Sequence, residues 1–272
     1  MTPTPPQLDT IAIEIDGDIG VLTLNRPGAM NAMDPGLIAD LPVAMSWFAD
    51  HAPVRALVVT GAGRAFSGGG DIKSWFKPGL DDPDFDLASD VRRVADVLHQ
   101  GIVDLRRIPY PVIAAVNGPA AGAGFSLALA CDLRIASEAA KFVIAYGRIG
   151  AAPDGGMTYF LPRVVGPAKA TELMLEDPDL DASDALRLGV VSKVVPADEL
   201  IETAKAKARE LAAKAPHYIR VSKRLLAQSL DNTLADHLQL ERHGIADAMA
   251  TEDARRGIEA FLEGKKPEFD GS

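Results

Sequence analysis

PVIAAVNGPAAGAGFSLALACDLRIAS, residues 111–137, contains a strand, a turn, a helix and a second strand. The apolar run PVIAAV has the length of a buried strand, and the small residues of NGPAAGAG lead into an apolar helix. The N-terminus of such a helix offers unpaired N–H groups and the positive end of a dipole. Close packing through Gly and Ala explains the same composition equally well. This stretch therefore predicts an α/β unit and leaves the purpose of its glycines open.

A similar unit precedes it at RALVVTGAGRAFSGGGDIK, residues 55–73. Three consecutive glycines allow main-chain N–H groups to face a ligand, and Asp71 is expected in the first turn of the following helix. Taken alone, a plain strand-to-helix turn is the simpler interpretation. A dinucleotide fingerprint fails because Phe66 occupies the third glycine position, and a phosphate loop fails because no G-K-[ST] follows. Two such units together favour two backbone donors that converge on one oxygen, as in an oxyanion hole.

Strands alternate with helices up to about residue 197, and helices alone follow. Two strands joined at residues 16–18 open the chain, and a helix over residues 34–51 begins with Asp34 as N-cap. Residues 86–107 predict a long amphipathic helix. The order predicts an α/β core over residues 1–197 and a helical region over residues 198–272, packed on the core or on a neighbouring subunit.

Composition narrows the classes of function. The chain has 272 residues and a formal net charge of −10, which argues against nucleic-acid binding because phosphate contacts rely on clustered Lys and Arg. Cys131 is the only cysteine, so no internal disulfide can form, and its apolar context predicts burial. The first ten residues lack a signal-peptide pattern, and no apolar run reaches the roughly 20 residues of a membrane helix. We expect a cytoplasmic protein without nucleic-acid or membrane partners.

One acid, Asp154, stands in GRIGAAPDGGMTYF, residues 147–160. Without further context it is interpreted as the N-cap of a helix that begins near Gly155. The five histidines show no metal-ligand spacing, and neither Ser67 nor Ser126 lies in G-x-S-x-G. The sequence therefore predicts no metal site and no nucleophilic-serine triad.

These stretches together resemble the enoyl-CoA hydratase/isomerase (crotonase) superfamily over nearly the whole chain. LNRPGAMNAM (24–33) resembles its N-terminal signature, and the two glycine-rich units resemble its oxyanion loops. DASDALRLGVVSKVVPADEL (181–200) and FLEGKKPEF (261–269) resemble its later landmarks. The resemblance implies a crotonase-like spiral of ββα units with a helical C-terminal trimerisation region. It also implies acyl-CoA substrates, a homotrimer or a dimer of trimers, and no cofactor apart from the coenzyme A of the substrate.

Carried over by position, the resemblance implies that Gly70 and Ala123 supply the two N–H groups that hold the thioester oxygen. Ala123 stands where glycine is commoner, but a backbone donor does not depend on the side chain. The implied substrate contacts come from both loops, from the segment before Asp154 and from the C-terminal region of a neighbouring subunit. They are Ser67, Gly69, Asp71, Ile72, Lys73, Ser126, Tyr146, Phe261 and Lys265.

The departures from the family pattern bear on the reaction. Ser126 and Tyr146 occupy the positions of the two glutamates with which hydratases of this family activate water, and neither is a carboxylate base. Asp154 lies eight residues past Tyr146. Some isomerases that resemble the phenylacetate-pathway enzyme carry their single acid there. The 4-chlorobenzoyl-CoA dehalogenases carry a nucleophilic aspartate there, with a tryptophan at the position of Tyr146.

We therefore expect an acyl-CoA double-bond isomerase that uses Asp154 as proton shuttle. The alternatives are an enoyl-CoA hydratase, a dehalogenase-like enzyme with Asp154 as nucleophile, and a non-catalytic CoA-binding scaffold in which Asp154 is a cap. The acyl group is open, because nearby aromatic residues either shape its pocket or belong to the core. They are Phe66, Trp75, Phe76, Phe125, Tyr146 and Phe160.

Overall fold

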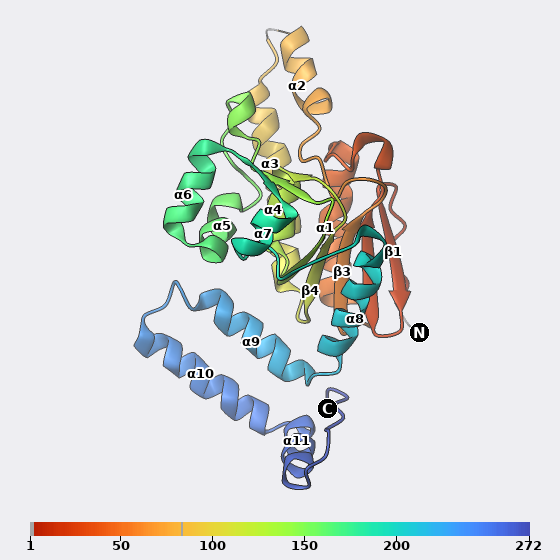
Figure 1. The fold of residues 1–272 in the computed structure, drawn as a ribbon, viewed down its shortest axis with the longest axis vertical. Coiled ribbons are helices and arrows are strands. Elements are labelled where there is room, and N and C mark those ends of the chain that lie inside the picture. Colours follow the sequence, from red (N-terminus) through yellow and green to blue (C-terminus); the bar gives the residue numbers. More distant parts are fainter. Residues whose placement is uncertain (1–2, 83) are drawn as a thin grey trace.

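Two β-sheets form the centre of the chain, which a computed structural model describes over residues 3–82 and 84–272 (Figure 1). The larger sheet has the order β1-β2-β3-β4-β6-β9 and is parallel except between β1 and β2. Its strands are β1 (Ile11–Asp16), β2 (Ile19–Leu24), β3 (Ala56–Gly61), β4 (Val112–Val116), β6 (Leu133–Ser137) and β9 (Lys193–Val195). The smaller sheet has the order β5-β7-β8, with strands β5 (Ala120–Ala121), β7 (Lys141–Val143) and β8 (Asp179–Asp181).

The central strands of the larger sheet, β3 and β4, are buried on both faces, which explains their continuous apolar runs. Successive residues of a strand point to opposite faces. In β3, Leu57 and Val59 join one hydrophobic cluster, whereas Ala56 and Val58 join another. The expectation of an α/β core built from such runs is confirmed.

Helices from distant parts of the sequence cover the two faces. α1 (Pro35–Asp50) and α3 (Leu87–Arg107) pack in the first cluster. Asp34 caps α1 as predicted, since its carboxylate accepts from the Leu37 N–H at 2.9 Å. α8 (Leu200–Ala212) supplies Ala204 and Ala208 to the second cluster, so the helical region predicted from residue 198 begins on the core.

Shorter elements surround the smaller sheet and the loops. The helices there are α2 (Ile72–Asp81), α4 (Ala123–Ala130), α5 (Met157–Val165), α6 (Pro167–Glu176) and α7 (Ala182–Arg187). Three 3-10 turns, η1 (Pro27–Ala29), η2 (Gly147–Ile149) and η3 (Ala197–Glu199), join the elements. β5 and β8 are absent from the sequence-based prediction because β5 lies in the small-residue stretch NGPAAGAG and β8 in the Asp-rich stretch DPDLDASD, both typical of turns.

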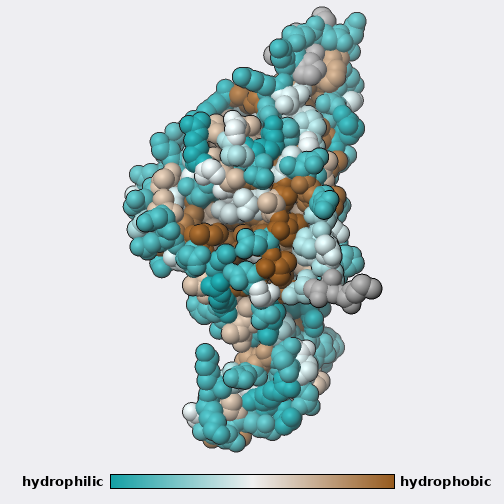
Figure 2. Space-filling view, turned by 90° about the vertical axis from the view of Figure 1, so that its right-hand side faces the viewer, coloured by the Kyte–Doolittle hydropathy of each residue, from teal (hydrophilic) through white to brown (hydrophobic). Residues whose placement is uncertain are grey.

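The last three helices extend away from the sheets (Figure 1). They are α9 (Pro216–Gln228), α10 (Leu234–Met249) and α11 (Glu252–Leu262). Lys223 anchors α9 to the core, because its ammonium donates to the carbonyls of Ile108 (2.9 Å) and Tyr110 (2.6 Å). On the face shown in Figure 2, hydrophobic residues gather over the middle of the core body, while the lobe of the last helices is mainly hydrophilic. Across the described residues, no helix combines the length and apolarity needed to cross a membrane.

Candidate active site

The two glycine-rich loops are pressed together at the ends of β3 and β4. The Ala121 N–H donates to the Ser67 carbonyl at 2.9 Å, and the Ser67 N–H donates to the Pro119 carbonyl at 3.1 Å. Gly69 has a φ of +84°, and a Cβ placed on it would lie 2.5 Å from the Ala121 carbonyl oxygen. Only glycine fits both this conformation and this contact. The glycines of the first loop therefore allow it to lie directly against the second.

Two asparagines outside the glycine runs hold the first loop. Asn31 is completely buried with a φ of +54°, and its side-chain amide donates to the carbonyls of Ala62 (2.9 Å) and Ala65 (2.8 Å). The side chain of Asn117 accepts from the Gly61 N–H at 3.2 Å and donates to the Gly63 carbonyl at 2.9 Å. The sequence singles out neither residue, because an asparagine after a turn or strand has no pattern that reveals a partner about 30 or 55 residues away.

Gly70 and Ala123 each present a main-chain N–H to the same cavity. Both neighbours of Gly70 are hydrogen-bonded to Met33. The Met33 N–H donates to the Gly69 carbonyl, and the Asp71 N–H donates to the Met33 carbonyl. In a parallel bridge of this kind, the N–H of the central residue, here Gly70, points away from the partner strand. Ala123 is the first residue of α4, where the N–H has no partner within the helix. Among the described residues, neither N–H has an acceptor.

The cavity beside these donors has a volume of about 350 Å³ and a mainly apolar lining. Its walls come from both loops, α2, α3 and the segment from residue 145 to 154. Of the candidate aromatic residues, Trp75, Phe76 and Tyr146 line it, whereas Phe66 and Phe125 are completely buried in the core. Phe160 lies in a separate cleft between α3, α5 and α9. A site of this size and composition suits a small apolar group held beside a few polar atoms.

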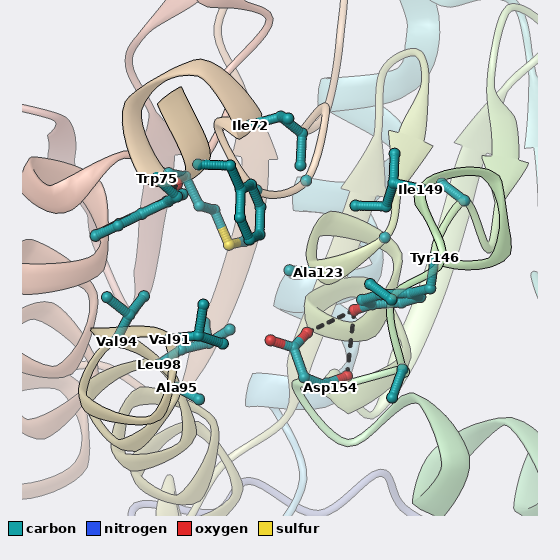
Figure 3. A pocket seen from close by; sticks show the side chains of 18 of the residues that line it. Ile72, Trp75, Val91, Val94, Ala95, Leu98, Ala123, Tyr146, Ile149 and Asp154 are labelled. Atoms are coloured by element: carbon teal, nitrogen blue, oxygen red, sulfur yellow. Dashed lines mark hydrogen bonds between the residues drawn. The ribbon is translucent and has the colours of Figure 1, made fainter. Parts of the chain in front are cut away.

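Asp154 faces this cavity, and its interpretation as a helix cap is wrong. α5 begins at Met157 with Gly156 as its N-cap, and no side chain caps it. The Asp154 carbonyl, not its carboxylate, accepts from the Met157 N–H at 3.1 Å. Its carboxylate lies among the cavity side chains, opposite Leu98 of α3 (Figure 3). The carboxylate is therefore free for a role other than capping.

The residues at the two departures from the family pattern contact Asp154 directly. The Tyr146 hydroxyl donates to Asp154 Oδ1 at 2.6 Å (Figure 3), and the Ser126 hydroxyl donates to the Asp154 carbonyl at 2.9 Å. Burial, reinforced by the neighbouring Asp154 charge, raises the pKa of Tyr146 well above its ordinary value of 10.0. Tyr146 is therefore a protonated donor at neutral pH. The structure thus brings together Ser126, Tyr146 and Asp154, which are 20 and eight residues apart in the sequence.

The other predicted contacts are divided between this cavity and distant places. Gly69 and Ile72 line the cavity. Ser67 does not line it: its hydroxyl is buried, donates to the Asn31 carbonyl at 2.8 Å and accepts from Gly69 at 3.2 Å. Asp71 precedes α2 instead of lying in its first turn, and its carboxylate faces Arg26 at 3.6 Å.

Three further predicted contacts lie on the surface. Lys73 is exposed on α2, next to the mouth of the cavity at Ile72. Phe261 and Lys265 are exposed at the end of α11, on the lobe that extends from the core (Figure 1). The single chain therefore does not bring Phe261 and Lys265 to its own cavity.

His99 is a neighbour of the site that the sequence did not reveal. Its Nε2 accepts from the Gly155 N–H at 3.2 Å, so it ties the residue after Asp154 to α3. His99 lies on α3, one residue past Leu98 of the cavity wall. His99 and Asp154 are 55 residues apart, and His99 belongs to no motif. The contact could therefore not be predicted from the sequence.

Comparisons with known proteins identify the family of the chain. The family model described as enoyl-CoA hydratase/isomerase matches residues 14–272. A probable enoyl-CoA hydratase of Rhizobium meliloti is 38% identical over 263 residues, covering 96% of this chain and 98% of the relative. The 1,2-epoxyphenylacetyl-CoA isomerase of Escherichia coli is 36% identical over 266 residues, covering 97% and 99%.

Solved structures give the same result for the fold. The crystal structure of an enoyl-CoA hydratase from Polaromonas sp. JS666 superposes with a TM-score of 0.88 at 33% identity, covering 96% of this chain and 99% of that one. The expected crotonase-like fold is thus confirmed. The chain belongs to the enoyl-CoA hydratase/isomerase family.

Proposed function

We propose that this protein moves the double bond of an enoyl-CoA thioester, with Asp154 carrying the proton between two carbons. The observation that carries the proposal is the composition of the cavity. Among the described residues, Asp154 is the only carboxylate that lines it, and the two candidate N–H donors, Gly70 and Ala123, line it too. A proton shuttle needs one base and a stabilised enolate, and this cavity holds the residues for both.

The proposed reaction starts at the carbon beside the thioester. In a 3-enoyl-CoA, Asp154 removes a proton from C2, and the electrons of that C–H bond move toward the thioester oxygen to form a dienolate. The N–H groups of Gly70 and Ala123 stabilise the charged oxygen more than the neutral carbonyl. Removing one such donor costs other enzymes about 2.7–4 kcal/mol of barrier. Asp154 then returns the proton to C4, which yields the conjugated 2-enoyl-CoA.

Hydration is the less favoured reaction because it needs a second group that binds and activates water. Ser126 and Tyr146, at the positions of the hydratase glutamates, are hydroxyls engaged with Asp154. The rest of the wall is mainly apolar, and α3 contributes Val91, Leu98 and their neighbours to it. This lining supports a substrate held away from water. The proposed reaction uses no metal and no cofactor beyond the coenzyme A of the substrate.

The direct test is a proton NMR time course in D₂O with a 3-enoyl-CoA and a 2-enoyl-CoA, in the presence of EDTA. For the wild type, the double bond moves and deuterium enters C2 or C4. For Asp154→Asn the rate of both events falls by roughly 10²–10⁴, the contribution of a positioned base. Formation of 3-hydroxyacyl-CoA by the wild type, with an active Asp154→Asn variant, would refute the proposal. Halide release from a 4-chlorobenzoyl-CoA would favour the dehalogenase alternative.

Self-association of the last helices is a second part of the proposal, in the form of a homotrimer or a dimer of trimers. Large apolar side chains are exposed along α9 to α11, among them Leu226, Leu238, Ile245, Met249 and Phe261. Exposed apolar surface of this kind favours a protein partner. In the assembly, Phe261 and Lys265 would approach the coenzyme A bound to a neighbour. Sedimentation velocity tests the oligomeric state, and a monomer at micromolar concentration would refute the proposed self-association.

A further inference from the structure

A hydrogen-bonded frame behind Asp154 distinguishes the two oxygens of its carboxylate. Tyr146 has one hydroxyl proton and three oxygens within reach: Asp154 Oδ1 at 2.6 Å, the Asp154 carbonyl at 3.3 Å and Ser126 Oγ at 3.3 Å. The shortest of these contacts, to a charged oxygen, takes the proton. Ser126 gives its own proton to the Asp154 carbonyl at 2.9 Å. Tyr146 therefore fixes one carboxylate oxygen of Asp154, and Ser126 fixes its main-chain carbonyl.

The second oxygen, Oδ2, has a different environment. Within residues 3–82 and 84–272, no hydrogen bond is donated to it. Figure 3 shows the carboxylate between Tyr146 on one side and the side chains of α3 on the other. That side of α3 presents Val91, Ala95 and Leu98, which share one helix face through their spacing of three and four residues. Oδ2 thus faces the space left for the carbons of a ligand.

Tyr146 is itself held in place through Asp177, which does not line the cavity. Ala145, with a φ of +67°, donates its N–H to the Asp177 carboxylate at 3.0 Å. Arg148 binds the same carboxylate at 3.0 Å, so both sides of Tyr146 are fixed to Asp177. On the inner side, Ser126 belongs to α4, the helix whose first residue is Ala123. Through Ser126, Asp154 is therefore connected to α4, the helix whose first residue is the candidate oxyanion donor Ala123.

We propose that Tyr146, supported by Ser126, is a positioning residue that occupies Oδ1 of Asp154 and leaves Oδ2 as the single oxygen that exchanges the proton with substrate. This inference rests on the proposed function. One anchored oxygen stops the carboxylate from turning, so Oδ2 keeps its alignment with both carbons while the proton moves between them. Small losses of alignment of this kind reduce rates by about 10²-fold in enzymes.

The test compares Tyr146→Phe with Tyr110→Phe. Tyr110 is a matched control because its hydroxyl also makes a 2.6 Å bond, to the Phe48 carbonyl, and it does not line the cavity. For Tyr146→Phe we expect kcat for 3-enoyl-CoA isomerisation to fall about 10- to 100-fold, with KM and the Kd of butyryl-CoA nearly unchanged. Tyr110→Phe keeps the wild-type kcat. Ser126→Ala, as a second variant, lowers kcat to a smaller extent at unchanged KM.

A further readout separates positioning from a loss of folding. In D₂O, a fixed shuttle returns part of the original C2 proton to C4, and this internally transferred fraction falls in Tyr146→Phe. Wild-type kcat in Tyr146→Phe, or a loss that appears only in Kd, overturns the inference. If the wild type isomerises and Asp154→Asn does not, that outcome leaves the proposed function intact. A wild type that moves no double bond would overturn the proposed function itself.

Discussion

Substitution of Gly69 by alanine tests whether close contact between the two loops creates the site. The new Cβ would lie 2.5 Å from the Ala121 carbonyl oxygen and 3.5 Å from the Ala123 nitrogen. Ala121 is two residues before the candidate donor Ala123. The contact is with backbone atoms, which cannot turn aside as a side chain can, so relief requires the loops to separate. Both stability and catalysis should therefore suffer.

The magnitude has two parts. A φ of +84° costs a non-glycine residue roughly 1–2 kcal/mol. Overpacking against fixed atoms adds about 1–3 kcal/mol to this cost. Together the free energy of unfolding should fall by about 2–5 kcal/mol, a large share of the roughly 5–15 kcal/mol that stabilises a typical protein. Displacement of one oxyanion donor should lower kcat by about 10²–10³.

Gly189→Ala is the matched control. Gly189 has a φ of +77°, and a Cβ added there would meet no atom of the described residues within 4 Å, so it carries the backbone cost without the contact. Urea unfolding at one protein concentration should show a loss of about 1–2 kcal/mol for Gly189→Ala, with kcat/KM near that of the wild type. The reasoning is refuted if Gly69→Ala loses no more stability than Gly189→Ala and keeps the wild-type kcat/KM for enoyl-CoA isomerisation.

Three other predictions concern groups elsewhere in the chain. Burial raises the pKa of the Cys131 thiol to about 12, with Asp132 as the next cause; a disulfide reagent at about pH 8 should modify it only when the chain is unfolded. Burial raises the pKa of Tyr110 above its ordinary value of 10.0. Its contribution to stability is complete below about pH 10 and declines at higher pH, as the unfolded chain ionises first. Urea midpoints should therefore fall less steeply with alkaline pH in Tyr110→Phe. Ala95→Phe fills part of the cavity, so KM should rise more for a long acyl-CoA than for a short one in steady-state assays.

Local signals made the elements of the core predictable from the sequence. Apolar runs such as ALVVTG mark buried strands, and Asp34 before Pro35 marks the start of a helix. β5 and β8 could not be predicted because they lie in stretches rich in Gly, Pro or Asp, which are typical of turns. Each element that was predicted correctly is specified by neighbours within a few residues.

Contacts across the site could not be predicted in this way. Asn31 with Ala65, His99 with Gly155 and Ser126 with Asp154 join residues 28 to 56 positions apart. Their side chains are ordinary in their local contexts, and only the packing of α3 and α4 against the loops brings them together. The cap interpretation of Asp154 failed because the helix begins two residues later than the local pattern suggests.

The position of the acid within this frame bears on which reaction the site favours. In the proposed reaction the N–H groups of Gly70 and Ala123 hold the thioester oxygen, and this would also set where the carbons of the acyl group lie. A reaction that adds water needs groups to hold that water as well as the carbon chain. Here the hydroxyls of Ser126 and Tyr146 occupy the positions of those groups, and both donate hydrogen bonds to Asp154. Under the proposed mechanism, hydroxyls in place of two acids therefore do more than remove a water site, because Tyr146 would fix one oxygen of Asp154 and leave the other to react.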